Sequence, residues 1–359
     1  MGSYPRREAR LQPTASVIVP TYRRPEQLGR LLAGLLQQDI PSHQYEIIVV
    51  ADGFSSPCRG AVERLAERAV VSVKYFAKSH GGPAAARAFG AGQARGELLI
   101  FVDDDMLIGT DFVREHVAAH REVGPVAVNC EFAWKLEARP ESFRRWYARR
   151  VEEWTAARRA ALWQLGDGLF GIPNVLLTTA NISVAREDYD RVGGFDEGYL
   201  FSCEDQDFGL RLADAGVRGV VTTRTHATHV ETHSTLQKVA RRQAMGARDT
   251  VRFMRRYNVL DRQGQQNLVM VNDPIKVGVD PWQVLIKKLF KSVIASELIS
   301  PLVFAAMAVW GRTSLGPSFL EHGYELVVGA HLRKGWCQGR RMYGVDAAAI
   351  RPGGTARAA

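Results

Sequence analysis

Three consecutive carboxylates end a short apolar run in the first third of the chain. Leu98–Val102 is followed directly by Asp103, Asp104 and Asp105. Such a run is typical of a strand buried on both faces of a parallel sheet. Three acids at its end repel one another, and burying them without compensation is costly. A divalent cation such as Mg²⁺ or Mn²⁺, which prefers hard oxygen ligands, would compensate them; a solvated acidic turn is the alternative.

Two other apolar runs also end in polar residues. Ala15–Pro20 leads into the loop Thr21–Pro25, and Tyr45–Ala51 ends at Asp52. Segments with helical spacing of apolar residues separate these runs, so strands and helices alternate, which predicts right-handed βαβ units and a mostly parallel α/β sheet. Ligands of such sheets bind at the carboxyl ends of the strands. We therefore expect the three polar strand ends to share one crevice.

The composition indicates an ordinary globular protein with an anionic partner. The 359 residues carry a formal net charge of +9. No zinc-type spacing and no basic stripe with interleaved aromatic residues stands out, so nucleic acid is not expected, and a phosphorylated ligand or an acidic membrane surface is favoured. The four scattered cysteines predict reduced thiols and a cytoplasmic protein, and residues 1–14 contain no apolar segment typical of a signal peptide.

The pattern predicts three parts. Residues 1–13 are expected to be a disordered tail, residues 14–235 a catalytic domain, and residues 236–359 a helical extension. Within the extension, 293–310 is apolar but contains Glu297 and Pro301, so it is marginal for a membrane-spanning helix. A basic cluster precedes it, formed by Lys287, Lys288 and Lys291. This pattern suits an interfacial helix on an anionic membrane, and a helix that packs on the catalytic domain is the alternative.

In their order and rough spacing, several short motifs over about residues 14–235 together resemble family 2 glycosyltransferases of the GT-A fold. They are Ser16–Arg23, Val49–Gly53, Gly82–Arg87, Phe101–Asp105, Gly193–Asp196 and Cys203–Asp207. The resemblance implies a nucleotide-diphospho-sugar fold, a nucleotide-sugar donor, a divalent metal and inversion at the anomeric carbon.

The resemblance also implies a metal site. Asp103-Asp104-Asp105 occupies the place of the family's Asp-X-Asp motif, so Asp105 is expected to coordinate Mn²⁺ or Mg²⁺ directly, and Asp103 to meet the metal through water or to bind the ribose. Asp104 is expected near the donor, with a solvated role as the alternative. His229 is the expected histidine ligand, with His233 as the second candidate.

Donor contacts are expected from the strand ends and the loops beside them. Asp52 is expected to accept a hydrogen bond from the base N3–H, which favours uracil or thymine; a turn-forming Asp-Gly pair is the alternative. Arg87 is expected to reach the diphosphate or to pair with an aspartate. The remaining predicted donor-binding residues are Pro20, Thr21, Tyr22, Arg23, Gly82, Asp103, Asp104 and Asn181.

Direct displacement needs a base that removes the proton of the acceptor hydroxyl. Glu204 and Asp205 occupy the position of the family's catalytic acids, so we expect Asp205 to be the base and Glu204 to position the acceptor. Both residues also suit the first turn of a helix, where acids are favoured, and Asp207 is assigned to that structural role.

The predicted function is therefore an inverting, metal-dependent hexosyltransferase-like enzyme. It would move a sugar from a UDP- or dTDP-sugar to an acceptor hydroxyl on a glycan, lipid-linked glycan or small molecule, in polysaccharide, glycolipid or natural-product synthesis. A nucleotidyltransferase of similar fold is an alternative, although the first loop lacks its glycine-rich, lysine-bearing signature. A non-catalytic nucleotide- or carbohydrate-binding module is the third, although it would not need Glu204 and Asp205.

Overall fold

A computed structural model describes residues 13–136, 142–231, 235–257, 270–312 and 317–343. Residues 1–12 of the predicted tail, and His233, lie outside this part of the chain. The chain divides into two compact units, each described by itself below. The first comprises Met1–Lys135, Arg158–Gly198 and Asp205–Val230, and the second Leu136–Ala157, Tyr199–Glu204 and Glu231–Ala359. The catalytic boundary at residue 235 stays a prediction.

Ten strands of the described residues form one sheet in the order β3-β2-β1-β4-β9-β6-β10-β8-β7, with β5 paired to β10. Strands β1 to β4 are parallel, whereas β9 runs antiparallel to β4. The predicted α/β fold class is confirmed. The strands are β1 (Ala15–Thr21), β2 (Tyr45–Asp52), β3 (Ser72–Lys78), β4 (Leu98–Val102), β5 (Met106–Ile108), β6 (Val126–Leu136), β7 (Trp163–Gly166), β8 (Leu169–Gly171), β9 (Asn181–Ala185) and β10 (Arg218–Glu231).

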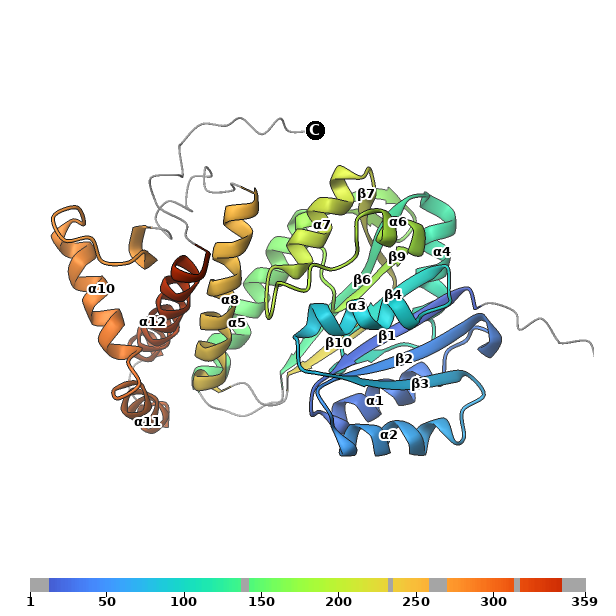
Figure 1. Ribbon diagram of the computed structural model, residues 1–359, viewed down its shortest axis with the longest axis horizontal. Coiled ribbons are helices and arrows are strands. Elements are labelled where there is room, and N and C mark those ends of the chain that lie inside the picture. The colour runs from blue at the N-terminus through green and yellow to red at the C-terminus, as the bar shows by residue number, and fades with distance from the viewer. Residues whose placement is uncertain (1–12, 137–141, 232–234, 258–269, 313–316, 344–359) are drawn as a thin grey trace, which may run out of the picture. The chain divides into compact units, whose positions relative to one another are not determined.

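Helices connect the parallel strands and cover both faces of the sheet (Figure 1). The helices with residues in the first unit are α1 (Pro25–Leu35), α2 (Ser56–Ala66), α3 (Pro83–Gln93), α4 (Phe112–Val123), α5 (Ser142–Ala160), α6 (Arg186–Arg191) and α7 (Glu204–Asp214). Alternate residues of β1 point to opposite faces, as the period of two in a strand requires. Val17 and Val19 pack with the apolar side of α1, whereas Ile18 packs in the cluster that includes α3.

The second unit is a helical assembly with its own core. Its long helices α8 (Leu236–Tyr257) and α12 (Pro317–Tyr343) pack together, and α10 (Trp282–Ile294) lies on the other side of α12 (Figure 1). The apolar section predicted for 293–310 is broken, because α10 ends at Ile294 and Pro301 lies in the first turn of α11 (Ser300–Trp310). None of the described helices is both long and apolar enough to cross a membrane.

One prediction for this unit is wrong. Lys288 was grouped with Lys287 and Lys291 as a cation available to lipid headgroups, but its side chain is 1% exposed. Its Nζ lies 2.8 Å from each carboxylate oxygen of Asp280. The sequence pattern does not distinguish an exposed lysine from one that is buried against a nearby acid. Asp280 precedes Lys288 by eight residues.

The buried carboxylate of Glu46 links the first strands of the parallel sheet. Glu46 on β2 accepts hydrogen bonds from Ser16 Oγ at 2.8 Å, from Lys74 Nζ at 2.8 Å and from the backbone N–H of Arg95 at 2.7 Å. Burial by itself would raise the pKa of Glu46, but these donors hold it below its ordinary value of 4.5. The carboxylate thereby joins β1, β2, β3 and the turn that follows α3.

We expect Glu46→Gln to lower the free energy of unfolding by about 3 kcal/mol, since it leaves Lys74 and Arg95 without their buried counter-charge. Because the pKa of Glu46 is lowered, its contribution is present above pH 4.5 and is lost as the pH falls through the lower, folded-state pKa. Urea unfolding at several pH values measures this difference. Glu63→Gln, which removes an exposed partner of Arg59, is the control. A deficit that does not shrink in acid would contradict the assignment.

Candidate active site at the carboxyl edge of the sheet

The ends of β1 and β4 bring the acidic triplet against two residues of the first loop. Thr21, the last residue of β1, donates its hydroxyl to Asp104 Oδ2 at 2.7 Å. Arg24 Nη1 lies 3.2 Å from Asp104 Oδ1 and 2.8 Å from Asp105 Oδ2. One guanidinium therefore pairs with two acids of the triplet. Helix α1 positions it, because Arg24 immediately precedes the first turn of this helix.

The pKa of Asp104 lies well above its ordinary value of 3.8. Burial raises its pKa to about 7, and the neighbouring Arg24 opposes this rise, whereas Asp105 and Asp103 add to it. A carboxyl with such a pKa exchanges protons near neutrality, and any added positive charge would favour its ionised form. The solvated role considered for Asp104 does not fit this burial, since the residue is 4% exposed.

Asp105 faces His229 across the short pairing of β5 with β10. This pairing sets His229 opposite Met106, directly after the triplet. His229 Nε2 lies 3.3 Å from Asp105 Oδ1, and the ring packs on Trp134 with centroids 4.0 Å apart. Both partners are largely buried, with 12% of each side chain exposed.

An oxygen donor and an imidazole nitrogen at this separation suit neighbouring positions around one divalent cation. Mn²⁺ accepts both ligand types, and such cations commonly use few protein ligands together with water and substrate phosphates. Among the described residues, no group of three or more His, Cys, Asp or Glu side chains is arranged to hold a metal. Asp105 and His229 thus fit a cation, with its remaining ligands coming from elsewhere, and the metal itself stays a prediction.

Asp103 pairs with a buried arginine and lies near the predicted base. Arg87, on α3, donates from Nη2 to Asp103 Oδ1 at 2.6 Å, which is the aspartate pairing considered for it from the sequence. Asp205 accepts a hydrogen bond from Thr179 Oγ1 at 2.6 Å. Burial raises the pKa of Asp205; Arg87 and Thr179 oppose the rise, whereas the charge of Asp103 adds to it. The base candidate therefore belongs to the same electrostatic cluster as the acids.

The loop that carries Thr179 is held by a buried polar network. Asn129 Oδ1 accepts from Arg158 Nη2 at 2.8 Å and from the backbone N–H of Thr178 at 3.0 Å. Asn129 Nδ2 donates to the carbonyl of Thr178 at 2.8 Å. Burial lowers the pKa of Arg158 to about 10, so its guanidinium remains charged at neutral pH. This network fixes the approach of Thr179 to Asp205.

A second cluster of polar residues lies at the end of β2, beside the first loop. Asp52 accepts from the backbone N–H groups of Gly81 and Gly82, both at 2.8 Å, and lies 2.8 Å from His80 Nδ1. The ring of His80 stacks on Tyr22 with centroids 4.7 Å apart. The backbone amides of Gly81 and Gly82 thus already serve Asp52, and Gly82 has φ +93°, a conformation that a side chain would strain.

The other residues singled out in the sequence are buried, or lie beside the acidic cluster without contacting it. Asn181, at the start of β9, is fully buried, and its Oδ1 accepts from the backbone N–H of Cys130 at 3.1 Å. Glu204 is the buried first residue of α7, and Asp207 pairs with Arg211 at 2.7 Å, in keeping with a structural role for Asp207. Pro20 lies in β1, where it is buried. The guanidinium of Arg23 lies over the ring of Tyr22.

The sequence analysis missed three residues that the structure brings into the site. They are Arg24 beside Asp104 and Asp105, His80 beside Asp52, and Thr179 beside Asp205. In the sequence, Arg24 is only one of two arginines in the first loop, and no spacing singles out His80. Thr179 precedes Asn181, a predicted donor contact, by two residues, and this proximity was the one available signal.

Part of the chain is similar to proteins of a known family. Residues 16–170 match the family model described as glycosyl transferase family 2. Over 242 residues the chain is 31% identical to validoxylamine A glucosyltransferase of Streptomyces hygroscopicus subsp. limoneus, covering 62% of this chain and 53% of that protein. It is also 31% identical over 235 residues to the O-antigen biosynthesis protein RfbC of Myxococcus xanthus, covering 62% of this chain and 18% of that protein.

The chain spans about half the length of the validoxylamine A glucosyltransferase that it matches, and less of RfbC. Among solved structures, the mannosyltransferase PcManGT of Pyrobaculum calidifontis, in complex with GDP-Man and Mn²⁺, matches with a TM-score of 0.55 and 18% identity, over 90% of this chain and 88% of that chain. At this identity the likeness concerns the fold.

We expect Arg24→Met to raise the affinity for Mn²⁺, measured calorimetrically without nucleotide, by about threefold to tenfold. The guanidinium holds the carboxylates that a cation would need, so its removal eliminates a competitor. The titration is made at about pH 8 and, because loss of Arg24 raises the pKa of Asp104 above its wild-type value of about 7, again at about pH 8.5. Arg23→Met, which removes the adjacent guanidinium over Tyr22, is the control. Unchanged or weaker Mn²⁺ binding in Arg24→Met would count against this competition.

Proposed function

We propose that this chain, a member of glycosyl transferase family 2, is a metal-dependent glycosyltransferase that transfers a sugar from a UDP- or dTDP-sugar to an acceptor hydroxyl with inversion. The observation that carries the proposal is the position of Asp205, a carboxylate whose pKa burial raises, in the same charged cluster as Asp103 and Arg87. A binding module would need the acids that hold a ligand, but it would not need a second carboxylate with the properties of a base.

The donor subsite in this proposal extends from Asp52 to the acidic triplet. Tyr22 and His80 offer stacked rings beside Asp52, which suits an aromatic base with an N–H donor. Arg24 and Arg87 would pair with the diphosphate when they release an aspartate. Asp105 and His229 would hold the divalent cation, which supplies charge neutralisation for the departing nucleoside diphosphate. Asp103 would meet the ribose or the metal's water.

The acceptor side of the proposal depends on Asp205. A base is most effective when its pKa lies near the working pH, because it is then both ionised and basic enough to accept a proton. Burial raises the pKa of Asp205 towards this range, while the Thr179 hydroxyl keeps the carboxylate oriented and favours its charged form. Glu204, adjacent in the chain, would position the acceptor hydroxyl.

The proposed acceptor and location rest on the relatives and on the cysteines. Validoxylamine A glucosyltransferase and RfbC support either a small-molecule acceptor or a surface polysaccharide. All four cysteines are free thiols, which supports the proposed cytoplasmic location. A peripheral position on the inner face of the cell membrane is part of the proposal, and the surface that would provide it is argued separately below.

We expect Asp205→Asn to abolish transfer and to spare donor binding, because it removes the base and leaves the acidic triplet intact. Asp105→Ala should abolish both turnover and Mn²⁺-dependent nucleotide binding. Thermal shifts with UDP- and dTDP-sugars, with and without Mn²⁺, identify the donor and measure its binding; nucleotide release measures turnover. Asp214→Asn, on the exposed end of α7, is the control. Full turnover in Asp205→Asn would refute the base assignment.

A second expectation concerns the pH dependence of transfer. Thr179→Val removes a hydrogen bond that favours the ionised form of Asp205, so the pKa of Asp205 should rise further. The acidic limb of the rate profile should therefore move to higher pH, while the rate at alkaline pH recovers. Thr223→Val, at an exposed position on β10, should leave the profile in place. A uniform loss of rate with an unmoved limb would assign Thr179 a purely structural role.

A further inference from the structure

Helix α10 of the second unit turns a row of large apolar side chains to the solvent. Its exposed residues are Trp282, Ile286, Leu289, Phe290 and Val293. Spacings of three and four residues place them on one face of the helix. Trp282 is 67% exposed and Phe290 54%, whereas Val284 and Ile294, which point elsewhere on the helix, are buried. Helix α10 thus presents a hydrophobic face that nothing among the described residues covers.

Helix α11 follows α10 and adds to its exposed apolar surface, because it has no polar face. Its sequence, Ser300–Trp310, contains no charged residue, yet Leu302 is 66% exposed and Val309 60%. A helix that is apolar all round is normally buried in a core or in a membrane. With 11 residues and a rise of about 1.5 Å per residue, α11 is far too short for a hydrocarbon layer of about 30 Å. It can lie within a membrane surface but not cross it.

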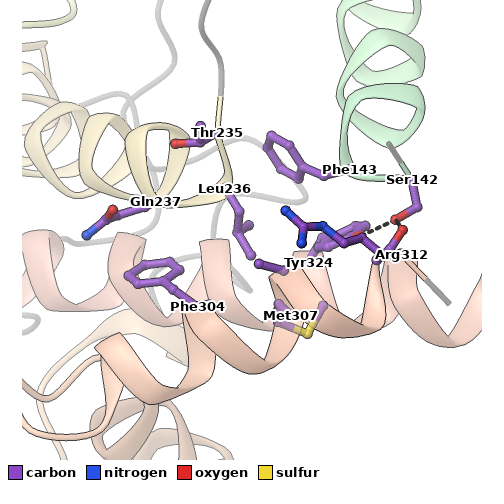
Figure 2. A pocket seen from close by; sticks show the side chains of 11 residues that line it. Ser142, Phe143, Thr235, Leu236, Gln237, Phe304, Met307, Arg312 and Tyr324 are labelled. Carbon is purple, nitrogen blue, oxygen red and sulfur yellow. Dashed lines mark hydrogen bonds between the residues drawn. The ribbon is translucent and has the colours of Figure 1, made fainter. Parts of the chain in front are cut away.

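The other side of α11 borders a cavity rather than a filled core. Phe304 and Met307 line a cavity of about 270 Å³ together with Phe143, Leu236 and Tyr324, as Figure 2 shows. This volume lies below the range of about 300–1,000 Å³ that is usual for small-molecule sites, so the cavity is not assigned a ligand of its own. It leaves α11 incompletely packed on its inner side also.

The charged groups around this surface are mainly basic. Lys287 and Arg312, which follows the end of α11, are exposed, whereas Lys291 turns its ammonium toward Gly329 of α12 and is only partly exposed. The acid Glu297 lies 3.7 Å from Lys334 and is thus already paired. Asp280 is held by the buried Lys288, as described above, and does not offset the exposed cations. The apolar face is therefore bordered by positive charge.

We propose that the membrane face, defined as the exposed apolar residues of α10 and α11 with Lys287 and Arg312, docks on an anionic phospholipid surface. Trp282 and Trp310 suit the headgroup region, where indole rings are favoured. The cations would contact lipid phosphates while the aliphatic and Phe290 side chains enter the acyl boundary. A second copy of the chain fits less well, because a two-fold interface would bring the same cations together.

Flotation with vesicles tests this surface without donor or acceptor, so its outcome is independent of the proposed transfer activity. The full chain is mixed with vesicles of phosphatidylcholine alone or with phosphatidylglycerol, at low and high salt. The variants are Ile286→Ser with Phe290→Ser and Val293→Ser, and Lys287→Glu with Arg312→Glu. Val70→Ser, at an apolar residue that is 89% exposed in the first unit, is the matched control. Circular dichroism and thermal unfolding without ligand check that each variant is folded.

The proposal expects the wild type and the Val70 control to float with anionic vesicles and much less with neutral ones. Each multiple variant should lower the partition coefficient by roughly tenfold or more, and salt should weaken the wild-type binding. Absence of wild-type binding, or equal binding by the triple serine variant, would overturn the proposal. It would equally be overturned if sedimentation showed a dimer that the serine substitutions dissociate and that does not bind vesicles.

Discussion

The concentration of negative charge at the carboxyl edge of the sheet is the constraint on which the site depends. Asp103, Asp104 and Asp105 follow a strand with no exposed residue, so their charges cannot be left to solvent alone. Two arginines compensate them: Arg87 from α3 pairs with Asp103, and Arg24 from the first loop pairs with Asp105. In the proposed function, a substrate that brings phosphates and a cation to this edge would exchange partners with these groups.

This constraint also explains why neutral polar groups matter around the triplet. Thr21 donates to one acid of the cluster and Thr179 to the base candidate, and in both cases a hydroxyl favours the charged form of a buried carboxyl. The network of Asn129 and Arg158 holds the second of these hydroxyls in place. Positioning therefore extends well beyond the residues that would touch a substrate.

The two units meet different physical requirements. The first buries its strands on both faces and concentrates polar groups at one edge, which gives a rigid frame for charged ligands. The second packs α8 against α12 but leaves the outward sides of α10 and α11 apolar and exposed. Exposed apolar area of this kind is a cost in water, and contact with another apolar phase removes that cost.

The sequence by itself determined the alternating α/β fold, the buried strands and the acidic strand end, because apolar periodicity and charge repulsion are local properties. It also offered Arg87 pairing with an aspartate as one of two readings, which the structure realises. Only the tertiary structure decided that Arg24 neutralises Asp104 and Asp105, that His80 joins Asp52 and that Lys288 is buried on Asp280. These contacts depend on side-chain direction and on burial across distant segments, and no spacing in a single chain encodes either.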